Sequence, residues 1–354
     1  MFQALEGQAI QVLDSAITSL QHDLARYEPQ PTRARMCLFP QSKLDKETRD
    51  KLALDVRKVI QDVVGIEHFP QSPYELNIQL SAQLQVDGLS LTRRPLQLAG
   101  YYLKRSRTLS QTPMFVEGGK RRVGTNSVFE LICGGIKHHF YRTLEEAQGK
   151  EINFASAGRE DVDAQVFGQG RLMLLTIPDP TRNADDPSEA FFQSLEEQVA
   201  QTSNDLVRVS RLRVATEDDK QFVLEGAELR RKLYVCVIEL ERPSDISLDV
   251  IDNLVALTIK QRTPIRVAHR RAMMERERIV HRTTLAPISP TVFVYWIDAG
   301  AGFYIKEFIH GDLGRTSPSV SEMLNVKARL VTLDFLGCVQ DDSSIENIQA
   351  KDFW

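Results

Sequence analysis

Three carboxylates stand beside one arginine in the segment Gly158-Arg159-Glu160-Asp161-Val162-Asp163. Glycines bound this segment, and strand-like residues flank it, so the pattern predicts a loop between two strands. A carboxylate held next to Arg159 is favoured in its charged form, which makes it available as a base or a nucleophile. A solvated acidic turn has the same composition, so the segment alone leaves both interpretations open.

Two further segments combine aromatic and charged side chains. Between Ala299 and Thr316, small residues precede Tyr304, Lys306 and Glu307, and a second glycine-rich turn follows. Glycines let the backbone approach a ligand closely, although the spacing matches no phosphate-binding or dinucleotide-binding loop. Tyr234 lies at the start of an expected strand, where a tyrosine is usually a half-buried strand residue.

Arginines are dense between Lys260 and Arg282, and they include Arg266, Arg270 and Arg271. Arginines spaced along strands can hold a phosphate backbone. A solvated charged face is the alternative, but acidic residues are few in this run. The overall net charge of −4 does not indicate a nucleic-acid partner, so the local clustering of basic residues carries this argument.

The N-terminal elements predict a small α+β module over residues 1–98. Apolar residues recur at helical spacing in residues 1–27 and again from Lys46 to Val64, where Gly65 ends the second helix. Apolar and polar residues then alternate from Leu76 to Val86, the period of a half-buried strand. Residues 99–124 are basic and polar, and they predict an ordered connector that either contacts a polyanion or is a solvated linker.

Strands dominate residues 125–354, and a few helices interrupt them. This pattern predicts an α+β sheet domain. Strands are expected at residues 152–157, 172–177, 206–215, 222–228, 233–240, 265–268, 278–282, 291–299 and 328–335, and helices at residues 128–140, 186–199, 248–257 and 319–324.

Bulk composition narrows the class of protein. The 354 residues, 42% hydrophobic and 26% charged, are enough for two domains with cores of their own. The four cysteines form no Cys-x-x-Cys pair, which favours free thiols in a reducing compartment over disulfides or zinc. No carboxylate cluster accompanies His138 and His139, so we expect no metal. No apolar run reaches membrane-spanning length, and charged residues near the N-terminus argue against a secretory signal.

Taken together, these segments resemble the archaeal and eukaryotic pseudouridine synthases that modify uridines 54 and 55 in the T-arm of tRNA and carry an N-terminal THUMP RNA-binding region. The resemblance covers roughly residues 74–339. It rests on the loop Gly158–Asp163, the turn Gly168–Arg171, the pair Lys232 and Tyr234, and residues 263–272, 304–308 with 315–316, and 106–113.

The resemblance implies the architecture and the reaction. We expect a catalytic domain with a mixed or antiparallel sheet and helices packed on it, joined to a partial THUMP-like module over residues 1–98. The implied activity is an isomerase that needs no cofactor. The implied partner is tRNA, and the implied state is a monomer away from membranes, in the cytoplasm or the nucleus, with an organelle also open.

The resemblance also implies roles for single residues. Asp161 occupies the place of the catalytic aspartate in a Gly-Arg-x-Asp loop, whereas the offset of Asp163 is wrong. Tyr234 matches the tyrosine that stacks on the target base, and Lys306 matches the basic residue that pairs with the aspartate. The remaining residues expected to bind substrate are Tyr304, Arg159, Arg266, Arg270, Arg271 and the apolar Leu330.

The sequence departs from the family pattern within the matching segments and in its N-terminal part, which lacks the paired cysteines of eukaryotic members, and other functions stay open. Gln165 stands where the family usually has an arginine, and Leu172 and Met173 stand where it has Pro-Phe. A non-catalytic RNA-binding protein with the same fold is one alternative. A hydrolase that uses Asp161 and Asp163 is another, but alternate strand residues point to opposite faces, so this pair converges only in a bent loop.

Overall fold

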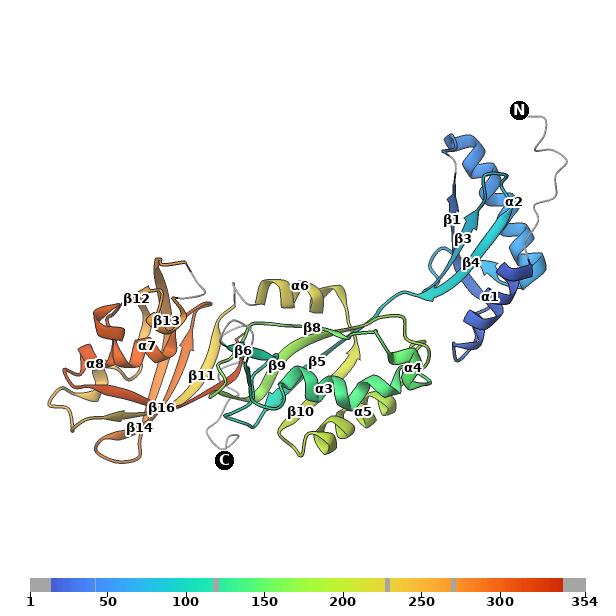
Figure 1. Ribbon diagram of the computed structural model, residues 1–354. Coiled ribbons are helices and arrows are strands. Elements are labelled where there is room, and N and C mark those ends of the chain that lie inside the picture. Colours follow the sequence, from blue (N-terminus) through green and yellow to red (C-terminus); the bar gives the residue numbers. More distant parts are fainter. Residues whose placement is uncertain (1–13, 42, 117–120, 227–229, 269–271, 340–354) are drawn as a thin grey trace. The chain divides into compact units, whose positions relative to one another are not determined.

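The computed structural model describes residues 14–41, 43–116, 121–226, 230–268 and 272–339 (Figure 1). Two compact units make up the described chain. The first contains residues up to Gln97 together with Ile136–Asn153 and Thr176–Ser188, and the second contains Leu98–Gly135, Phe154–Leu175 and the residues from Glu189 onward.

In its described residues, the first unit combines a mixed sheet with three helices. Strand β1 pairs in parallel with both β2 and β3, and β3 pairs antiparallel with β4. The elements are α1 (Asp14–Ala25), β1 (Arg33–Pro40), α2 (Lys46–Val64), β2 (Glu67–His68), β3 (Tyr74–Leu80) and β4 (Val86–Arg93), followed later by a 3-10 turn (Lys137–His139) and α4 (Leu144–Ala147). The predicted bounds of α2 are confirmed, because Asp45 caps its first turn and Gly65 ends it in the left-handed conformation at φ 78°.

The single strand expected from Leu76 to Val86 is wrong. The chain forms a hairpin there: β3 ends at Leu80 and β4 begins at Val86. In the turn between them Leu84 has a φ of 62°. The alternation of apolar residues continues through the turn, so periodicity alone did not reveal the reversal.

The second unit is built on a ten-stranded sheet. The strand order is β10-β5-β9-β16-β11-β14-β13-β12-β15, and β8 also pairs with β9. Its strands are β5 (Leu96–Lys104), β8 (Asn153–Ser156), β9 (Gln165–Ile177), β10 (Val207–Val214), β11 (Lys232–Leu240), β12 (Val255–Arg262), β13 (Glu275–Pro287), β14 (Val292–Ala299), β15 (Thr316–Ser317) and β16 (Ala328–Cys338), with a separate hairpin of β6 (Met114–Val116) and β7 (Arg121–Val123). The prediction of an α+β domain with a mixed sheet is confirmed.

Five helices accompany the described part of this sheet. They are α3 (Val128–Ile136), α5 (Glu189–Thr202), α6 (Glu217–Gly226), α7 (Ile305–His310) and α8 (Val320–Met323), with 3-10 turns at Leu248–Val250, Ile265–Val267 and Asp312–Gly314. Helix α7 contacts both α8 and β16, which places these two short helices on the same part of the sheet (Figure 1).

Several expected elements are corrected. Residues 99–104, expected to begin a connector, belong to strand β5. Of the strand expected at residues 222–228, residues 222–226 belong to helix α6 and the rest lie outside the described residues. The helix begins where Thr216 and Asp219 bond each other's backbone N–H. The strand expected at residues 265–268 is a 3-10 turn, and the helix expected at residues 248–257 is a three-residue 3-10 turn followed by β12.

One narrow pairing joins the two halves of the large sheet. Strands β9 and β16 run in parallel, and their register pairs are Asp334 with Gln165 and Phe335 with Val166. Asp334 also accepts a bond from the backbone N–H of Gln165 at 3.1 Å. We call this pairing the seam. Strands β10, β5 and β9 lie on one side of it, and β16, β11 and β14 lie on the other.

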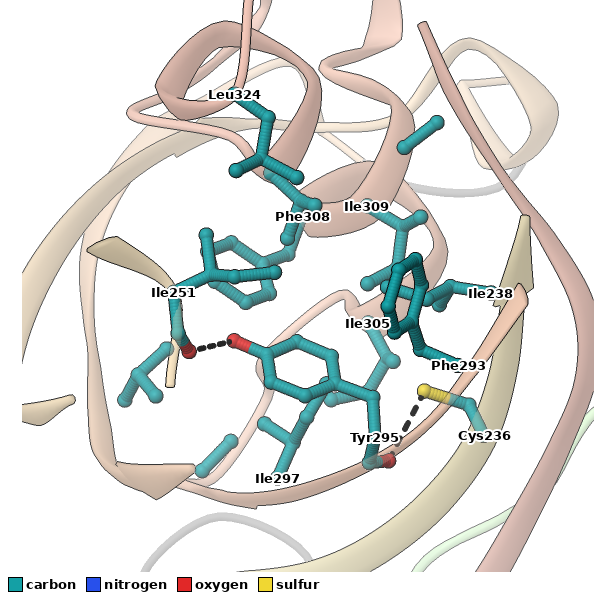
Figure 2. Close-up of a cluster of buried hydrophobic side chains, with 14 of the residues drawn as sticks. Cys236, Ile238, Ile251, Phe293, Tyr295, Ile297, Ile305, Phe308, Ile309 and Leu324 are labelled. Atoms are coloured by element: carbon teal, nitrogen blue, oxygen red, sulfur yellow. Dashed lines mark hydrogen bonds between the residues drawn. The ribbon is translucent and has the colours of Figure 1, made fainter. Parts of the chain in front are cut away.

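The larger core packs under α7 and α8, on the β11–β14 side of the seam. Figure 2 shows Phe308, Ile309 and Leu324 facing Phe293, Ile297 and Tyr295 from the strands. Tyr295 is buried, and its hydroxyl donates to the carbonyl of Ile251 at 2.8 Å (Figure 2). Because α7 begins at Ile305, this core fixes the position of Lys306, the next residue.

The four cysteines, all within the described residues, are free thiols, and Cys236 is the buried one. The described helices include none with the length and apolar character that a membrane span requires. The described residues also contain no group of three or more histidines, cysteines and carboxylates placed to hold a metal ion.

Candidate active site

The acidic loop predicted from the sequence lies between β8 and β9. Gly158 has a φ of 94°, which a side-chain-bearing residue rarely adopts, and it turns the chain out of β8. A second turn follows, in which the N–H of Ala164 donates to the carbonyl of Asp161 at 3.1 Å. The loop is therefore bent, and it brings the carboxylates of Asp161 and Asp163 to the same cation.

Two cations contact the carboxylate of Asp161. Arg266 Nη1 lies 3.1 Å and Lys306 Nζ 3.2 Å from Asp161 Oδ2. The side chain of Asp161 is 32% exposed, so these contacts orient it without enclosing it. The predicted pairing of Lys306 with Asp161 is present in the structure. Arg266, predicted as a substrate-binding residue, also contacts Asp161.

Lys306 also binds the second carboxylate of the loop. Its Nζ donates to both oxygens of Asp163, at 2.9 and 2.8 Å. Burial raises the pKa of Asp163, but the hydrogen bond and charge of Lys306 outweigh it and hold that pKa below its ordinary value. The loop is bent, as the hydrolase alternative with Asp161 and Asp163 requires. Geometry therefore does not exclude that alternative, and the protonation state of the carboxylates must decide.

Helix α7 and the turn at Ile265–Val267 hold the cations in place. Arg266 Nε donates to Glu307 at 2.8 Å, and Glu307 is 1% exposed. Tyr304 precedes the helix, and its backbone exchanges two hydrogen bonds with the buried side chain of Gln261. Tyr304 is half-buried beside this site, and its predicted contact with substrate stays a prediction.

The third carboxylate of the loop points inward. Glu160 Oε2 lies 2.9 Å from Arg171 Nε, and the two side chains are 2% and 1% exposed. Tyr102 donates to the same oxygen at 2.8 Å, and Arg171 Nη1 donates to the carbonyl of Ala157 at 2.8 Å. Gly170 permits this, because a Cβ there would lie 2.8 Å from the carbonyl oxygen of Tyr102.

Sequence reasoning missed this buried cluster, which supports the loop from inside. From the sequence, Glu160 looked like a third carboxylate of a solvated turn. In the structure its side chain is buried, whereas that of its neighbour Asp161 is partly exposed. The signal that was available is the strand that follows. Arg171 lies in a stretch of β9 that is buried without interruption from Gly170 to Leu175, and a buried guanidinium needs a charged or polar partner.

Tyr234 lies on β11 and connects to the same cluster. Its ring meets Phe335 edge-on at 5.8 Å, and the Arg171 guanidinium lies 3.9 Å from the centroid of the Phe335 ring. Burial raises the pKa of Tyr234 to about 12, so its phenol is neutral at neutral pH. Glu160, Arg171 and Phe335 thus form a continuous series of contacts from the acidic loop to Tyr234.

The other predicted residues have different positions. Arg159 is exposed and donates to Thr112 Oγ1 at 3.1 Å, so its expected role as the charge partner of the carboxylates is wrong; Arg266 and Lys306 fill that role. Leu330 packs against the larger core, opposite Ile238, and its place in a substrate pocket stays a prediction. Arg270 and Arg271 lie outside the described residues.

The family model for the C-terminal part of Pus10 matches residues 97–338. This range contains both halves of the large sheet, the acidic loop, Tyr234 and Lys306. The chain belongs to the Pus10 C-terminal family. The Pus10 match begins at the boundary between the two units, since the first unit's leading segment ends at Gln97.

Curated relatives extend the Pus10 similarity. The chain is 31% identical over 306 residues to tRNA pseudouridine synthase Pus10 of Xenopus laevis, a match that covers 86% of this chain and 56% of that protein. It is 31% identical over 288 residues to tRNA pseudouridine synthase Pus10 of Thermofilum pendens, covering 81% and 61%. The chain therefore spans less than two thirds of the length of either relative.

Among solved structures, a Cbf5-Nop10-Gar1 complex is similar over 69% of this chain and 60% of that chain, with 15% sequence identity and a TM-score of 0.32. So distant a likeness carries no argument about function.

Proposed function

We propose that this chain is a tRNA pseudouridine synthase that isomerises a T-arm uridine, at tRNA position 54, 55 or both, with Asp161 as its catalytic carboxylate. Membership of the Pus10 C-terminal family supports the reaction class. The observation that carries the assignment of the residue is the partly exposed Asp161 carboxylate, oriented by Arg266 and Lys306 on a loop supported from inside.

The reaction breaks the bond between N1 and C1′ of uridine and forms a bond between C5 and C1′. The base turns between these two steps, C5 loses a proton and N1 gains one, so atoms balance without any redox change. A carboxylate beside C1′ serves either as a nucleophile at that carbon or as a base toward a sugar proton. Asp161 is exposed enough to reach a nucleotide that approaches from solvent.

The target base must leave its stack, which costs on the order of a few kcal/mol. A stacking contact with Tyr234 would return about 1–3 kcal/mol. Arginines and lysines on the β12–β13 hairpin, such as the exposed Arg282 and Lys260, would add phosphate contacts. In this proposal the ring of Tyr234 receives the base while Lys306 and Arg266 hold the carboxylate.

The charge state of Asp163 opposes the two-carboxylate hydrolase. Such an enzyme needs one carboxyl group that stays protonated near neutral pH to act as a general acid. The pKa of Asp163 is held below its ordinary value instead, by the hydrogen bond and charge of Lys306. A protein that only binds RNA has no need of Asp161, Tyr234 and Lys306 together.

The test is conversion of an unmodified tRNA transcript that carries tritium at C5 of uridine, in metal-free buffer. Wild-type protein should release tritium, and Asp161→Asn should reduce the single-turnover rate by about 10³-fold or more while tRNA binding changes less than about threefold. Asp163→Asn is the matched control, with a loss of about tenfold at most. Turnover by Asp161→Asn near the wild-type rate would place the catalyst elsewhere.

The position of the uridine is tested separately. Transcripts with cytidine at tRNA position 54, at position 55 or at both should lose the corresponding fraction of tritium release. Release that persists with both positions replaced would contradict the T-arm assignment and leave the reaction class intact.

A further inference from the structure

The last residue of β5, Lys104, is buried although it opens a run of charged residues. Its exposed fraction is 0%. Its Nζ donates to the carbonyls of Leu109 at 2.8 Å, Val162 at 2.8 Å and Asp161 at 3.2 Å. An ammonium group has three N–H donors, so these acceptors use all of them.

Burying an ammonium is costly unless its donors are satisfied, so the position of Lys104 requires an explanation. Two of its three acceptors are consecutive peptide carbonyls of the acidic loop, at Asp161 and Val162. Arg107 donates to the next carbonyl, that of Asp163, at 3.0 Å. Two cations from one segment therefore fix the backbone of residues 161–163.

This anchoring has a geometric consequence for the carboxylates. While Lys104 holds the carbonyls of Asp161 and Val162, the carboxylate of Asp161 contacts Arg266 and Lys306. These two cations contact the carboxylate, whereas Lys104 and Arg107 bind the backbone carbonyls of the loop.

We propose that Lys104 is a positioning residue: its ammonium fixes the backbone at Asp161 and Val162 so that the Asp161 carboxylate meets the target nucleotide. This inference rests on the proposed function. It gives the residue a role in the rate of the chemical step rather than in the affinity for tRNA.

The charged form of Lys104 is the one that suits this role. A neutral amine has two N–H donors and a lone pair, which would face the third carbonyl oxygen. The charged groups around it are the carboxylates of Glu160, Asp163 and Asp161 and the guanidinium of Arg107. Burial lowers the pKa of Lys104 to about 8, and the three carboxylates oppose that fall.

The pH dependence has a definite sign for both rate and stability. As the pH rises through about 8, Lys104 loses its proton and the loop loses one anchor, so the rate should fall. In the unfolded chain Lys104 keeps its proton up to about pH 10.4. Between about pH 8 and that value the unfolded state binds more protons than the folded state, so the contribution of Lys104 to the free energy of unfolding increases as the pH rises. Rate and stability therefore change in opposite directions.

The experiment compares wild type, Lys104→Met and Lys104→Arg in the single-turnover tritium assay, from about pH 6.5 to 9.5. Lys327→Met, which removes an exposed lysine (85%), is the matched control for loss of one positive charge. Because Lys104→Met leaves carbonyls unpaired, thermal unfolding measures the folded fraction, and rates are expressed per folded protein.

At pH 7, Lys104→Met should react on the order of 10²-fold more slowly than wild type, with a Kd for tRNA within about twofold. Lys104→Arg should recover part of the rate and lose the alkaline decline, since a guanidinium stays charged over the whole pH range of the assay. Lys327→Met should match wild type.

A Lys104→Met rate within about threefold of wild type, per folded protein, overturns the inference and leaves the proposed function standing. If neither variant folds, the wild-type pH series decides: a rate that does not decline between about pH 7 and 9 overturns it. A wild-type protein that releases no tritium at any pH removes the proposed function, and this inference with it.

Discussion

Each compact unit contains an aspartate that contacts cationic side chains. The two aspartates differ in how fully hydrogen bonds within the protein occupy their carboxylate oxygens. Asp179 of the first unit accepts from Tyr27 at 2.6 Å, Lys150 at 2.7 Å, Arg26 at 2.9 Å and the backbone N–H of Arg93 at 2.8 Å. These donors come from the turn after α1, the end of β4 and the segment after α4. Its carboxylate is saturated, and it holds three parts of the unit together.

Asp161 of the second unit is anchored in the opposite way. Its backbone carbonyl is bound from inside by Lys104, while its carboxylate faces two side-chain cations and is 32% exposed against 19% for Asp179. A carboxylate whose oxygens are all used organises the fold, whereas one held through its backbone keeps its oxygens for a reacting atom. The comparison predicts that stability depends on Asp179 and chemistry depends on Asp161.

The largest effect on stability should come from Asp179→Ala. The change removes the carboxylate that accepts from Lys150, Tyr27 and the N–H of Arg93. It should lower the free energy of unfolding by about 2–4 kcal/mol in urea denaturation. Asp161→Ala is the matched control and should cost less than about 1 kcal/mol, because its pairs are partly solvated. Equal losses for the two variants would break the comparison.

A smaller effect should separate the cations at Asp161 from those on the surface. Lys306→Ala should slow the single-turnover reaction by about 10–100-fold, or about 1.4–2.7 kcal/mol of activation free energy, with tRNA affinity changed less than the rate. Lys260→Ala, on the exposed face of β12, should weaken tRNA binding and leave the rate at saturation unchanged. A pure binding defect in Lys306→Ala would show that its role is wrong.

The smallest effect should appear at acidic pH. Burial raises the pKa of Asp179, but hydrogen bonds from Lys150, Tyr27 and the Arg93 N–H outweigh it, so the pKa lies below its ordinary value. Its contribution to stability is therefore complete above the ordinary value and is lost as the pH falls through the lowered one. The difference in unfolding free energy between wild type and Asp179→Asn should shrink from about pH 5 to pH 2. A constant difference would contradict this sign.

The sequence predicted the centre of the site better than its support. The pairing of Lys306 with Asp161 came from the resemblance to a family, and the structure contains it. Lys104 falls within the basic connector predicted over residues 99–124, because charge in a sequence does not show which strand ends are buried. The two-residue period of β5 predicts that Lys104 is buried, because it shares one face of the strand with Leu98 and Tyr102. All three are fully buried.

The same limit explains the errors in the fold. An apolar run at Phe222, Val223 and Leu224 fits a strand, but the reciprocal cap between Thr216 and Asp219 begins a helix before it. Arg266 was expected on a strand, whereas a 3-10 turn directs it to Asp161 and Glu307. Local hydrogen bonds and tertiary pairing decided these cases, and neither is visible in periodicity.

The seam between β9 and β16 has a consequence for how this protein can change over time. The loop with Asp161 leads directly into β9, whereas Lys306 and Arg266 come from the other side of the seam. One half of the sheet therefore supplies the carboxylate and the other half supplies its two cations. Either core can exchange apolar residues as long as its own volume is kept. The alignment of the two halves of the sheet depends on a few residues around Asp334. Substitutions at these residues would separate the Asp161 carboxylate from Lys306 and Arg266 while both cores stay folded.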